Sequence, residues 1–531
     1  MRPALLGGIL AMVALIVSPR GPVRFGAPPG SGVALADKHE SRSGEKKDKG
    51  KGERHKRSDR DDDDNYDEDG PPGTASTESS SGGRGRAGSG LTRGPYLQMV
   101  TPGGITVRWR TGVPAGSCVR YGTDPGRLEF LKETPGETNE HEVRLAELRP
   151  YTRYYYSVGD RATVLAAGQD CSFVTSPPLG AVRRVRVWIL GDSGAHGSAQ
   201  DRVLQAYDAF TNRAPADVWL LVGDNAYDAG TSLQYQAGFF TPFRARLRSI
   251  VAWPARGNHD LIRKGPDNDY YDFFTLPAAG EAGGTPSNTE AWYSFDYANV
   301  HFVCLDAERL SGSTAGAMLE WLRHDLAATR QEWLIAYWHH PPYSKGSHDS
   351  DSDDLMTAAR RVFLPVLEQG GVDLVVCGHS HSYERSFLLD GHYGPSATLD
   401  PAMILDRGDG RADGNGPYRK PTYGRPAPHE GAVYVVVGSS SKTGGGRLDH
   451  PAMAKSLNAL GSLVLGISGD RLDAAFAAER GRVADRFTIV KGEAPSAGRG
   501  RVSSEAPGGD PRDPRADSPR SSAGSSGGGD R

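Results

Sequence analysis

Five short polar motifs, each directly after an apolar run, carry the residues of this 531-residue chain that could do chemistry. A single Gly-Asp pair after a strand is usually a turn or a helix cap. Apolar runs of this length predict buried strands, and α/β proteins place ligands at the carboxyl edge of their sheets. We therefore expect the five motifs to converge on one site. Its predicted ligands are Asp192, Asp224, Tyr227, Asn258, His339, His379 and His381.

The donor types of these side chains indicate a pair of metal ions. Carboxylate, amide, phenol and imidazole groups without a thiolate suit hard or borderline cations such as Fe, Mn and Zn. Asp224 follows the apolar run 218–222, and we predict that it bridges the two ions. One shared carboxylate holds two ions about 3.5–4 Å apart, a spacing that stabilises in-line displacement at phosphorus. In His379-Ser-His381, alternate residues of an extended strand would face the same side.

The elements that position these motifs predict a layered α/β domain over residues 183–491. Apolar strand-like runs alternate there with helical stretches, of which residues 317–329 place Met318, Leu319, Leu322 and Leu326 on one face. The predicted strands include residues 185–190, 218–222, 333–338, 374–377 and 433–437.

Residues 91–178 have the pattern of a separate all-β domain. Residues 105–109 alternate apolar and polar side chains, as a half-buried strand does. The segment from Leu148 to Tyr154 resembles the L-x-P-x-T-x-Y corner of fibronectin type III-like sandwiches, in which the tyrosine hydroxyl bonds back to the backbone. We expect a fibronectin type III-like sandwich that packs against the α/β domain.

The two ends of the chain have the composition of targeting and disordered segments. Residues 1–36 read as a signal peptide, because the apolar run 4–17 is shorter than a membrane span and Ala34-Leu35-Ala36 is a cleavage signal. A cut nearer Ser18, closer to the apolar run, and an uncleaved membrane anchor are the alternatives. Residues 37–90 and 492–531 are charged or Ser/Gly-rich, and we predict a disordered linker and a disordered tail. The protein is thus expected to be secreted, periplasmic or at the cell surface.

Net charge and cysteine content narrow the partners and the redox chemistry. A net charge of −3 argues against a dedicated nucleic-acid binder, and we expect no membrane contact beyond the export signal. Cys118 and Cys171 fall in one predicted domain and could pair in an oxidising compartment, whereas Cys304 and Cys377 lie in apolar runs and are expected to be buried free thiols.

The set GDxG, GDxxY, GNHD, a histidine after an apolar strand, and GHSH resembles the calcineurin-like metallophosphoesterase superfamily. Tyr227, three residues after Asp224, and the continuation of GHSH into SYER resemble purple acid phosphatases. This resemblance implies an α/β domain with a β-sandwich core flanked by helices, preceded by the all-β domain. It also implies Fe(III), held by Tyr227, together with a divalent Zn, Fe or Mn ion. The first ion would bind Asp192, Asp224, Tyr227 and His381, and the second Asp224, Asn258, His339 and His379.

The resemblance further implies an exported acid phosphatase that hydrolyses phosphomonoesters by in-line attack of metal-bound hydroxide. His259 would contact the phosphate or the leaving oxygen, and His348 would protonate the leaving group, although a loop residue without a role is the alternative for His348. His340 is expected to have no role in the site, because its neighbour takes the ligand position. A phosphodiesterase or nucleotide pyrophosphatase, or a surface-binding protein with an idle metal site, remain the alternative functions.

Overall fold

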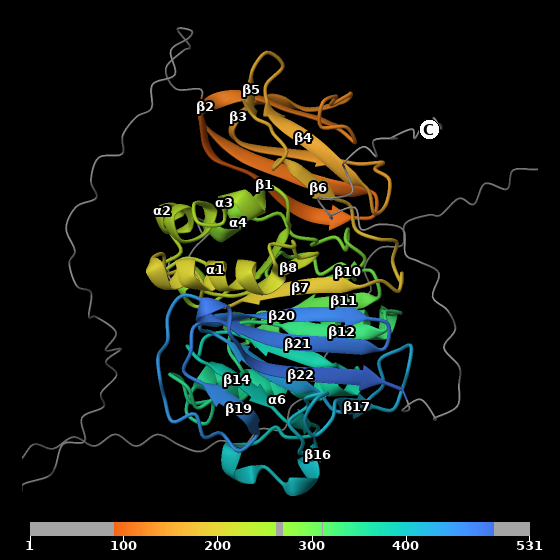
Figure 1. The fold of residues 1–531 in the computed structure, drawn as a ribbon, viewed down its shortest axis with the longest axis vertical. Helices are drawn as coiled ribbons and strands as arrows, with labels where there is room; N and C mark the ends of the chain where they lie inside the picture. Colours follow the sequence, from red (N-terminus) through yellow and green to blue (C-terminus); the bar gives the residue numbers. More distant parts are fainter. Residues whose placement is uncertain (1–89, 262–268, 311, 493–531) are drawn as a thin grey trace, which may run out of the picture. The chain divides into compact units, whose positions relative to one another are not determined.

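The structure is a computed structural model that describes residues 90–261, 269–310 and 312–492 (Figure 1). The predicted signal peptide, nearly all of the predicted linker and nearly all of the predicted tail lie outside the described residues. Among the described residues, no helix is both long and apolar enough to cross a lipid bilayer.

The N-terminal sheet contains six antiparallel strands. They are β1 (Leu91–Thr101), β2 (Gly104–Gly122), β3 (Phe130–Leu145), β4 (Arg153–Gly159), β5 (Val164–Ala166) and β6 (Ser172–Val174). The first three are longer than the short strands expected from sequence, because β2 pairs with β1 and β4 along different parts of its length and continues through an irregular pairing with β3.

The corner predicted between residues 148 and 154 makes its hydrogen bond. The backbone N–H of Arg149 donates to the hydroxyl of Tyr154 at 3.0 Å. This bond fixes the chain before β4, while the assignment of the sheet to the fibronectin type III class stays a prediction. Cys118 and Cys171 do not pair: both are buried free thiols, like Cys304 and Cys377, so the disulfide considered for them is absent from the structure.

Two seven-stranded mixed sheets follow, here called sheet I and sheet II. Sheet I has the order β17-β22-β21-β20-β7-β8-β9, and sheet II the order β10-β11-β12-β13-β18-β14-β19. The strands of sheet I are β7 (Val185–Leu190), β8 (Val218–Val222), β9 (Ala252–Ala255), β17 (Tyr418–Lys420), β20 (Gly461–Ser468), β21 (Arg471–Ala478) and β22 (Val483–Lys491). Those of sheet II are β10 (Tyr293–Tyr297), β11 (Val300–Cys304), β12 (Trp333–Tyr337), β13 (Leu374–Cys377), β14 (Tyr383–Ser386), β18 (Val433–Val437) and β19 (Met453–Leu457).

Each sheet contains a run of parallel strands. In sheet I, β7, β8 and β9 are parallel neighbours, and in sheet II β11, β12, β13 and β18 are parallel neighbours. A small two-stranded sheet pairs β15 (Leu388–Leu389) with β16 (Ile404–Asp406). Parallel neighbours bring their carboxyl ends to the same edge, so each run offers several loops at one place.

The inner faces of the two sheets form the main apolar core. The rings of Trp253 in β9 and Phe295 in β10 stack at 3.8 Å between centroids, and those of Tyr383 in β14 and Phe476 in β21 at 4.1 Å. Buried strands of this kind alternate their side chains between the two faces. In β12, for example, Ile335 joins the inter-sheet core while the neighbouring residues join the cluster on the outer face.

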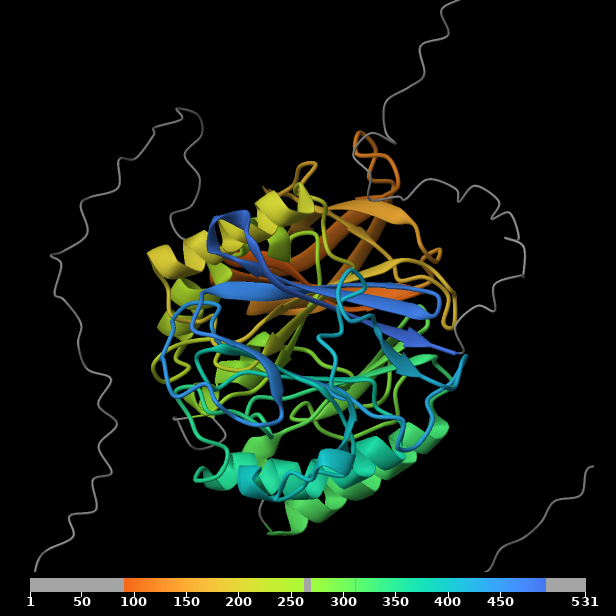
Figure 2. The same cartoon turned by 60° about the horizontal axis from the view of Figure 1, so that its bottom comes forward.

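Helices cover the outer faces of both sheets (Figures 1 and 2). They are α1 (Ser198–Thr211), α2 (Ser232–Tyr235), α3 (Arg244–Leu247), α4 (Asp269–Phe273), α5 (Gly312–Ala328) and α6 (Asp354–Gln369). On sheet I, Tyr207 of α1 stacks on Trp188 at 4.1 Å. On sheet II, Phe363 of α6 meets the ring of Trp338 edge-on at 5.2 Å. This β-sandwich with flanking helices matches the predicted α/β domain.

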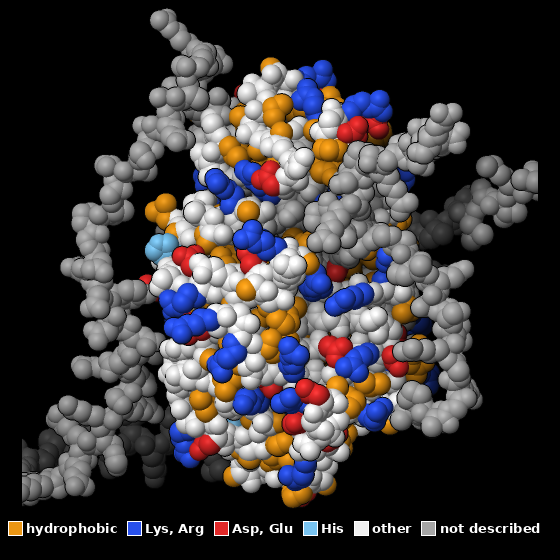
Figure 3. Space-filling view, viewed as in Figure 1, with side chains coloured by type: hydrophobic (Ala, Val, Ile, Leu, Met, Phe, Trp, Pro, Cys, Tyr) orange, Lys and Arg blue, Asp and Glu red, His pale blue; other side chains and the backbone are white. Residues whose placement is uncertain are grey.

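Charged side chains of both signs are interspersed on the face shown in Figure 3. Where β21 reaches the surface, Arg471 donates two hydrogen bonds to the carboxylate of Asp473, at 2.7 and 2.6 Å. Neighbouring opposite charges of this kind neutralise one another locally.

Arg93 of β1 links the N-terminal sheet to the first sandwich layer. Its guanidinium lies over the rings of Phe240 and Phe273, at 4.4 and 4.2 Å from their centroids, and donates to Gln236 Oε1 at 3.0 Å. The side chain is 4% exposed. This contact lies among the helices after β8, so the N-terminal sheet packs on the α/β domain as expected from sequence.

Candidate metal centre

Three polar residues follow the parallel strands of sheet I. Asp192 comes after β7, Asp224 after β8 and Asn258 after β9. Asp192 and Asp224 have φ values of 54° and 53°, in the left-handed region that non-glycine residues seldom occupy. Such conformations persist where the surrounding structure fixes them, and they concentrate at functional sites.

Sheet II contributes histidines from the ends of its own parallel strands. His339 follows β12 and is 1% exposed, whereas His379 and His381 lie between β13 and β14 and are 6% and 7% exposed. The expectation that His379 and His381 sit on an extended strand is wrong. His379 has φ 66°, and the backbone N–H of Ser380 bonds to the carbonyl of Gly378, so the segment bends sharply. The bend sends the two imidazoles to different partners.

The loops of the candidate centre approach one another closely, both between the two sheets and within sheet I, and this requires glycine. A Cβ on Gly378 would lie 2.5 Å from Asp192 Oδ2, and one on Gly257 would lie 2.1 Å from Asp224 Oδ1. The backbone N–H of His379 donates to Asp192 Oδ2 at 2.8 Å across the two sheets. The glycines of the motifs are therefore explained by contact between loops as well as by turn geometry.

Asp192, Asp224, Tyr227 and His381, predicted to share the first ion, lie together in one half of the candidate centre. The hydroxyl of Tyr227 donates to Asp224 Oδ2 at 2.8 Å and to Asp192 Oδ1 at 3.1 Å. His381 Nε2 lies 3.4 Å from Asp192 Oδ1. Ligand atoms that share one ion at about 2.1 Å are separated by about 3 Å, so this spacing suits a single cation.

Asp224, Asn258 and His339 form the other half, with His379 beside them. His339 Nε2 lies 3.4 Å from Asp224 Oδ1 and 3.0 Å from Asn258 Oδ1, while its Nδ1–H donates to the carbonyl of Val222 at 2.9 Å. The two oxygens of Asp224 thus face different halves of the centre. Asp192, Asp224 and His339 offer donor atoms that all lie within 4.8 Å of one another.

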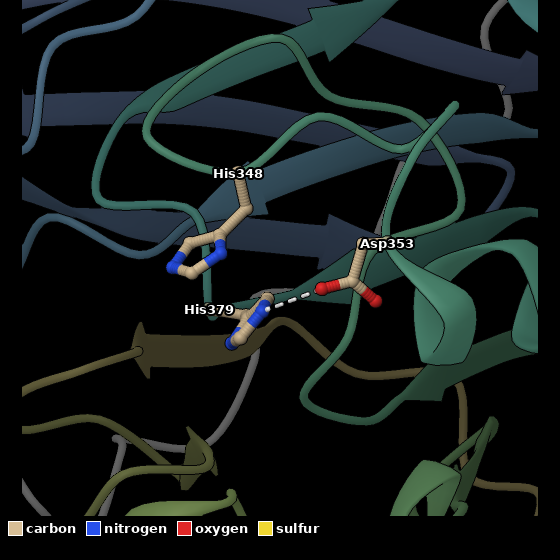
Figure 4. A group of neighbouring side chains, drawn as sticks. All are labelled: His348, Asp353 and His379. Carbon is tan, nitrogen blue, oxygen red and sulfur yellow. Dashed lines mark ion pairs between the residues drawn. The ribbon is translucent and has the colours of Figure 1, made fainter. Parts of the chain in front are cut away.

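His379 is oriented by a carboxylate that sequence reasoning missed. Its Nε2 lies 3.5 Å from Asp353 Oδ2, and its ring packs against that of His348 with the centroids 3.9 Å apart (Figure 4). The ring of His340 lies 4.0 Å from that of His379, centroid to centroid. Asp353 also caps α6, because its Oδ1 accepts the N–H of Met356 at 2.9 Å. With Nε2 directed at Asp353, Nδ1 is the ring nitrogen left for another partner.

The electrostatics of the first half oppose ionisation of Tyr227 in the absence of a cation. Burial and the neighbouring carboxylates of Asp192 and Asp224 raise the pKa of Tyr227 well above its usual value, so the phenol keeps its proton. A cation at this position would reverse the balance, since it stabilises the phenolate and the two carboxylates together.

In the second half, Asp224 and His339 each favour the charged form of the other. Burial by itself would raise the pKa of Asp224, but His339 lowers it well below the usual range. Burial by itself would lower the pKa of His339, but Asp224 and Asp192 raise it to about 10. Asp224 and His339, which are both predicted metal ligands, therefore attract each other as a carboxylate and an imidazolium.

The predicted substrate-contacting histidines lie at the rim. His259 begins a 3-10 turn (His259–Leu261), its side chain is 28% exposed, and its Nε2 lies 4.0 Å from Asp224 Oδ2. Burial, followed by the nearby His379 and His381, lowers the pKa of His348 to about 3. His348 is brought to the centre by its stacking on His379. His340 is buried, with Nδ1 3.1 Å from Glu308 Oε1.

Two further features escaped sequence reasoning. Asp260, read only as part of the GNHD motif, accepts hydrogen bonds from Gly257 N and Asn225 N and so ties two of the motif turns together. The loop after β18, Gly438 to Arg447, contacts both sheets of the centre: the N–H of Ser440 donates to the carbonyl of Gly191, and that of Gly444 to the carbonyl of His381. Gly438, directly after the predicted strand 433–437, was the sequence signal for this loop.

Most of the described chain matches two known protein families. The model of the calcineurin-like phosphoesterases matches residues 185–383, and that of the purple acid phosphatase N-terminal domain matches residues 93–175. The chain is a purple acid phosphatase-like member of the calcineurin-like metallophosphoesterases. Purple acid phosphatases are metal-dependent phosphoester hydrolases, and membership implies a binuclear metal centre.

The relatives of this purple acid phosphatase-like chain include plant enzymes. Purple acid phosphatase 23 of Arabidopsis thaliana is 29% identical over 51% of this chain and 62% of its own length, and purple acid phosphatase 18 of the same plant is 28% identical over 58% and 69%. The phosphoenolpyruvate phosphatase of Allium cepa is 26% identical over 56% and 62%. The chain thus spans about two thirds or less of the length of most of these relatives.

Two solved structures share the fold of this purple acid phosphatase-like protein. A purple acid phosphatase from yellow lupin seeds superposes with a TM-score of 0.57 at 20% identity, covering 76% of this chain and 75% of its own. PhoD superposes with a TM-score of 0.55 at 12% identity, covering 77% and 92%. At these identities the superpositions show the architecture and leave the chemistry to the site.

Proposed function

We propose that the chain is an exported, metal-dependent acid phosphatase that hydrolyses phosphomonoesters at a binuclear centre. The observation that supports this most directly is the position of Asp224. One of its carboxylate oxygens lies beside Tyr227 and the other beside His339, and these residues belong to the two halves of the site. A carboxylate between two sets of ligands is what a metal pair requires.

The residues proposed to hold the ions are divided between the sheets. Asp192, Asp224, Tyr227 and His381 would hold Fe(III), and Asp224, Asn258, His339 and His379 would hold a divalent Zn, Fe or Mn ion. The donor set supports this proposal, since the contacts among these side chains are made by oxygen and imidazole nitrogen and the four cysteines are free thiols. A phenolate oxygen favours the ferric state, and imidazole suits several divalent ions.

The bound ions would supply an activated water and neutralise the charge of the phosphate. The side chains of the centre perform the remaining tasks. His259 stands at the rim, with its Nδ1 2.6 Å from the carbonyl of Asp228, and its Nε2 would donate to a phosphate oxygen. His348, stacked on His379, would deliver a proton to the leaving oxygen once the negative charge of the bound phosphate has raised its pKa from about 3.

Export and the substrate class belong to the same proposal. The predicted signal peptide supports release to the cell surface, the periplasm or the medium. The Allium cepa relative is named for phosphoenolpyruvate, which is a phosphomonoester. For this chain we propose the substrate class, a phosphate ester, and no particular compound. Phosphodiester or nucleotide pyrophosphate hydrolysis on the same ligands is the second candidate, because this architecture supports related reactions.

A direct test combines metal analysis, a visible spectrum and turnover of 4-nitrophenyl phosphate. We expect two ions per chain, a visible absorption band from the Tyr227 phenolate on Fe(III), and loss of at least 99% of turnover in Asp224→Ala and Asn258→Ala. His196→Ala, an exposed residue near Asp192, is the matched control and should retain full activity.

Three outcomes would contradict the proposal. Fewer than two ions per chain would support a binding protein with an idle site. Faster turnover of bis(4-nitrophenyl) phosphate than of the monoester would support a phosphodiesterase. An iron-loaded protein without a visible band would remove the Tyr227–Fe(III) assignment.

A further inference from the structure

Lys442 is a cation at the metal centre that the proposed mechanism does not use. Its Nζ lies 4.0 Å from the centroid of the Tyr227 ring, whose hydroxyl bonds to both Asp192 and Asp224. The ammonium and the ligand carboxylates therefore flank the same ring. Within the described residues, no carboxylate forms an ion pair with Lys442.

Three other lysines of the fold are neutralised by aspartates. Lys345 pairs with Asp349 at 2.9 Å, and both Lys420 and Lys491 pair with Asp373 at 2.7 Å. Lys442 is half-buried, so its charge is only partly solvated. A partly desolvated ammonium that lacks a counter-ion attracts an anion.

The loop that carries Lys442 is fixed to both sheets rather than free to swing. Ser441 Oγ donates to the carbonyl of Asp192, and the N–H of Gly444 donates to the carbonyl of His381 at 2.9 Å. A Cβ on Gly444 would lie 2.4 Å from the Cβ of Ser347, so this loop packs directly on the segment that holds His348. The position of Lys442 at the centre is therefore built into the fold.

We propose that Lys442 binds the phosphate group of the substrate and thereby favours phosphomonoesters over phosphodiesters. This inference rests on the proposed phosphatase function. A monoester phosphate carries up to two negative charges, whereas a diester carries one. An added fixed cation stabilises the dianion more than the monoanion, because the attraction scales with the product of the charges. The lysine stem is flexible enough to leave the Tyr227 ring and meet an oxygen of the phosphate.

The test compares Lys442→Met with the wild type in the metal-loaded full chain. Methionine keeps an unbranched apolar stem of nearly the same length and removes the charge. A charge-assisted contact to phosphate is worth about tenfold or more in affinity. We expect kcat/KM for 4-nitrophenyl phosphate to fall about tenfold or more, and that for bis(4-nitrophenyl) phosphate to fall by less than about threefold. Lys442→Arg should recover most of the monoester rate.

The matched control is Arg447→Met, which removes a positive charge from the same loop. The guanidinium of Arg447 donates to Asp449 Oδ2 at 2.7 Å and is thus already neutralised. We expect it to leave both kcat/KM values unchanged. Metal content and the thermal midpoint of Lys442→Met should match those of the wild type.

The inference is overturned if both esters lose activity equally, if neither does, or if Lys442→Met loses metal. If the wild type hydrolyses neither ester, the proposed function fails by itself, and binding then decides the role of Lys442. In that case inorganic phosphate is titrated into the zinc-loaded proteins and followed by calorimetry. A Kd about tenfold weaker in Lys442→Met supports the anion site, and an unchanged Kd overturns it.

Discussion

Replacing Asp260 with alanine tests whether one buried carboxylate holds the turns of the metal centre together. Asp260 is 1% exposed and accepts hydrogen bonds from at least four donor groups of the described residues. The donors are the backbone N–H of Gly257 at 2.9 Å, the backbone and side-chain N–H of Asn225 at 3.0 and 2.9 Å, and the hydroxyl of Tyr235 at 2.7 Å. Gly257 precedes Asn258, and Asn225 follows Asp224, so both predicted ligands depend on this carboxylate.

The expected loss of unfolding free energy follows from the number of buried donors that Asp260→Ala leaves without an acceptor. Each buried donor without an acceptor costs about 1–3 kcal/mol, and losses at one site do not add fully. We therefore expect the metal-free protein to lose about 4 kcal/mol of unfolding free energy. Tyr235→Phe is the matched control, because it removes one donor together with its bond and should cost about 1 kcal/mol.

Urea unfolding of the metal-free proteins, followed by tryptophan fluorescence, measures the loss from the midpoint and slope. Metal content is measured in parallel, and we expect Asp260→Ala to retain fewer than two ions per chain. The reasoning is refuted if Asp260→Ala unfolds within about 1 kcal/mol of the wild type and still binds two ions.

Further predictions concern the core, the loops and the domain contact. Burial alone would lower the pKa of His301, but the hydrogen bonds that its ring N–H groups donate to the carboxylates of Asp296 and Asp325, at 2.6 and 2.8 Å, raise it to about 9. This stabilisation, about 3 kcal/mol, is complete below pH about 6.5 and is lost as the pH rises to about 9. The free energy of unfolding of the wild type should therefore fall over this pH range, and that of His301→Gln should lack this fall. Gly378→Ala should push the loops apart and leave fewer than two ions per chain in metal analysis; retention of both ions would contradict the packing argument. Arg93→Ala should cost about 2–3 kcal/mol in thermal unfolding with metal content unchanged, and a shift below about 0.5 kcal/mol would show that its ring contacts contribute little.

The strand pattern of the α/β domain was readable because burial on both faces produces continuous apolar runs. The predicted strand 333–338 is β12 (Trp333–Tyr337), and the predicted strand 374–377 is β13 (Leu374–Cys377). The helix expected at residues 317–329 is α5 (Gly312–Ala328). The prediction missed its first turn because few apolar residues mark the helical period there. Boundaries shift where polar residues continue an element whose stability comes from packing elsewhere.

Predictions that needed a distance between remote segments were less secure. Cys118 and Cys171 share a domain, yet sequence could not decide whether their side chains meet, and the structure leaves both as free thiols. The extended geometry assumed for His379 and His381 failed because the turn after β13 places His379 in the left-handed region. Asp353, at the start of α6, reaches His379 only through the packing of that helix beside the centre.

The sequence by itself predicted which side chains would hold metal ions, since their types and their places after buried strands are local properties of the chain. It also determined that the strands alternate with helices, because apolar runs and helical periodicity are local as well. Only the tertiary structure decided which loops touch. The contact of Lys442 with Tyr227 joins loops of the two sheets, and the bonds of Asp260 to Asn225 and Tyr235 join segments that follow neighbouring strands of sheet I. These contacts link parts of the chain that are remote in sequence, so they depend on how the strands and sheets pack.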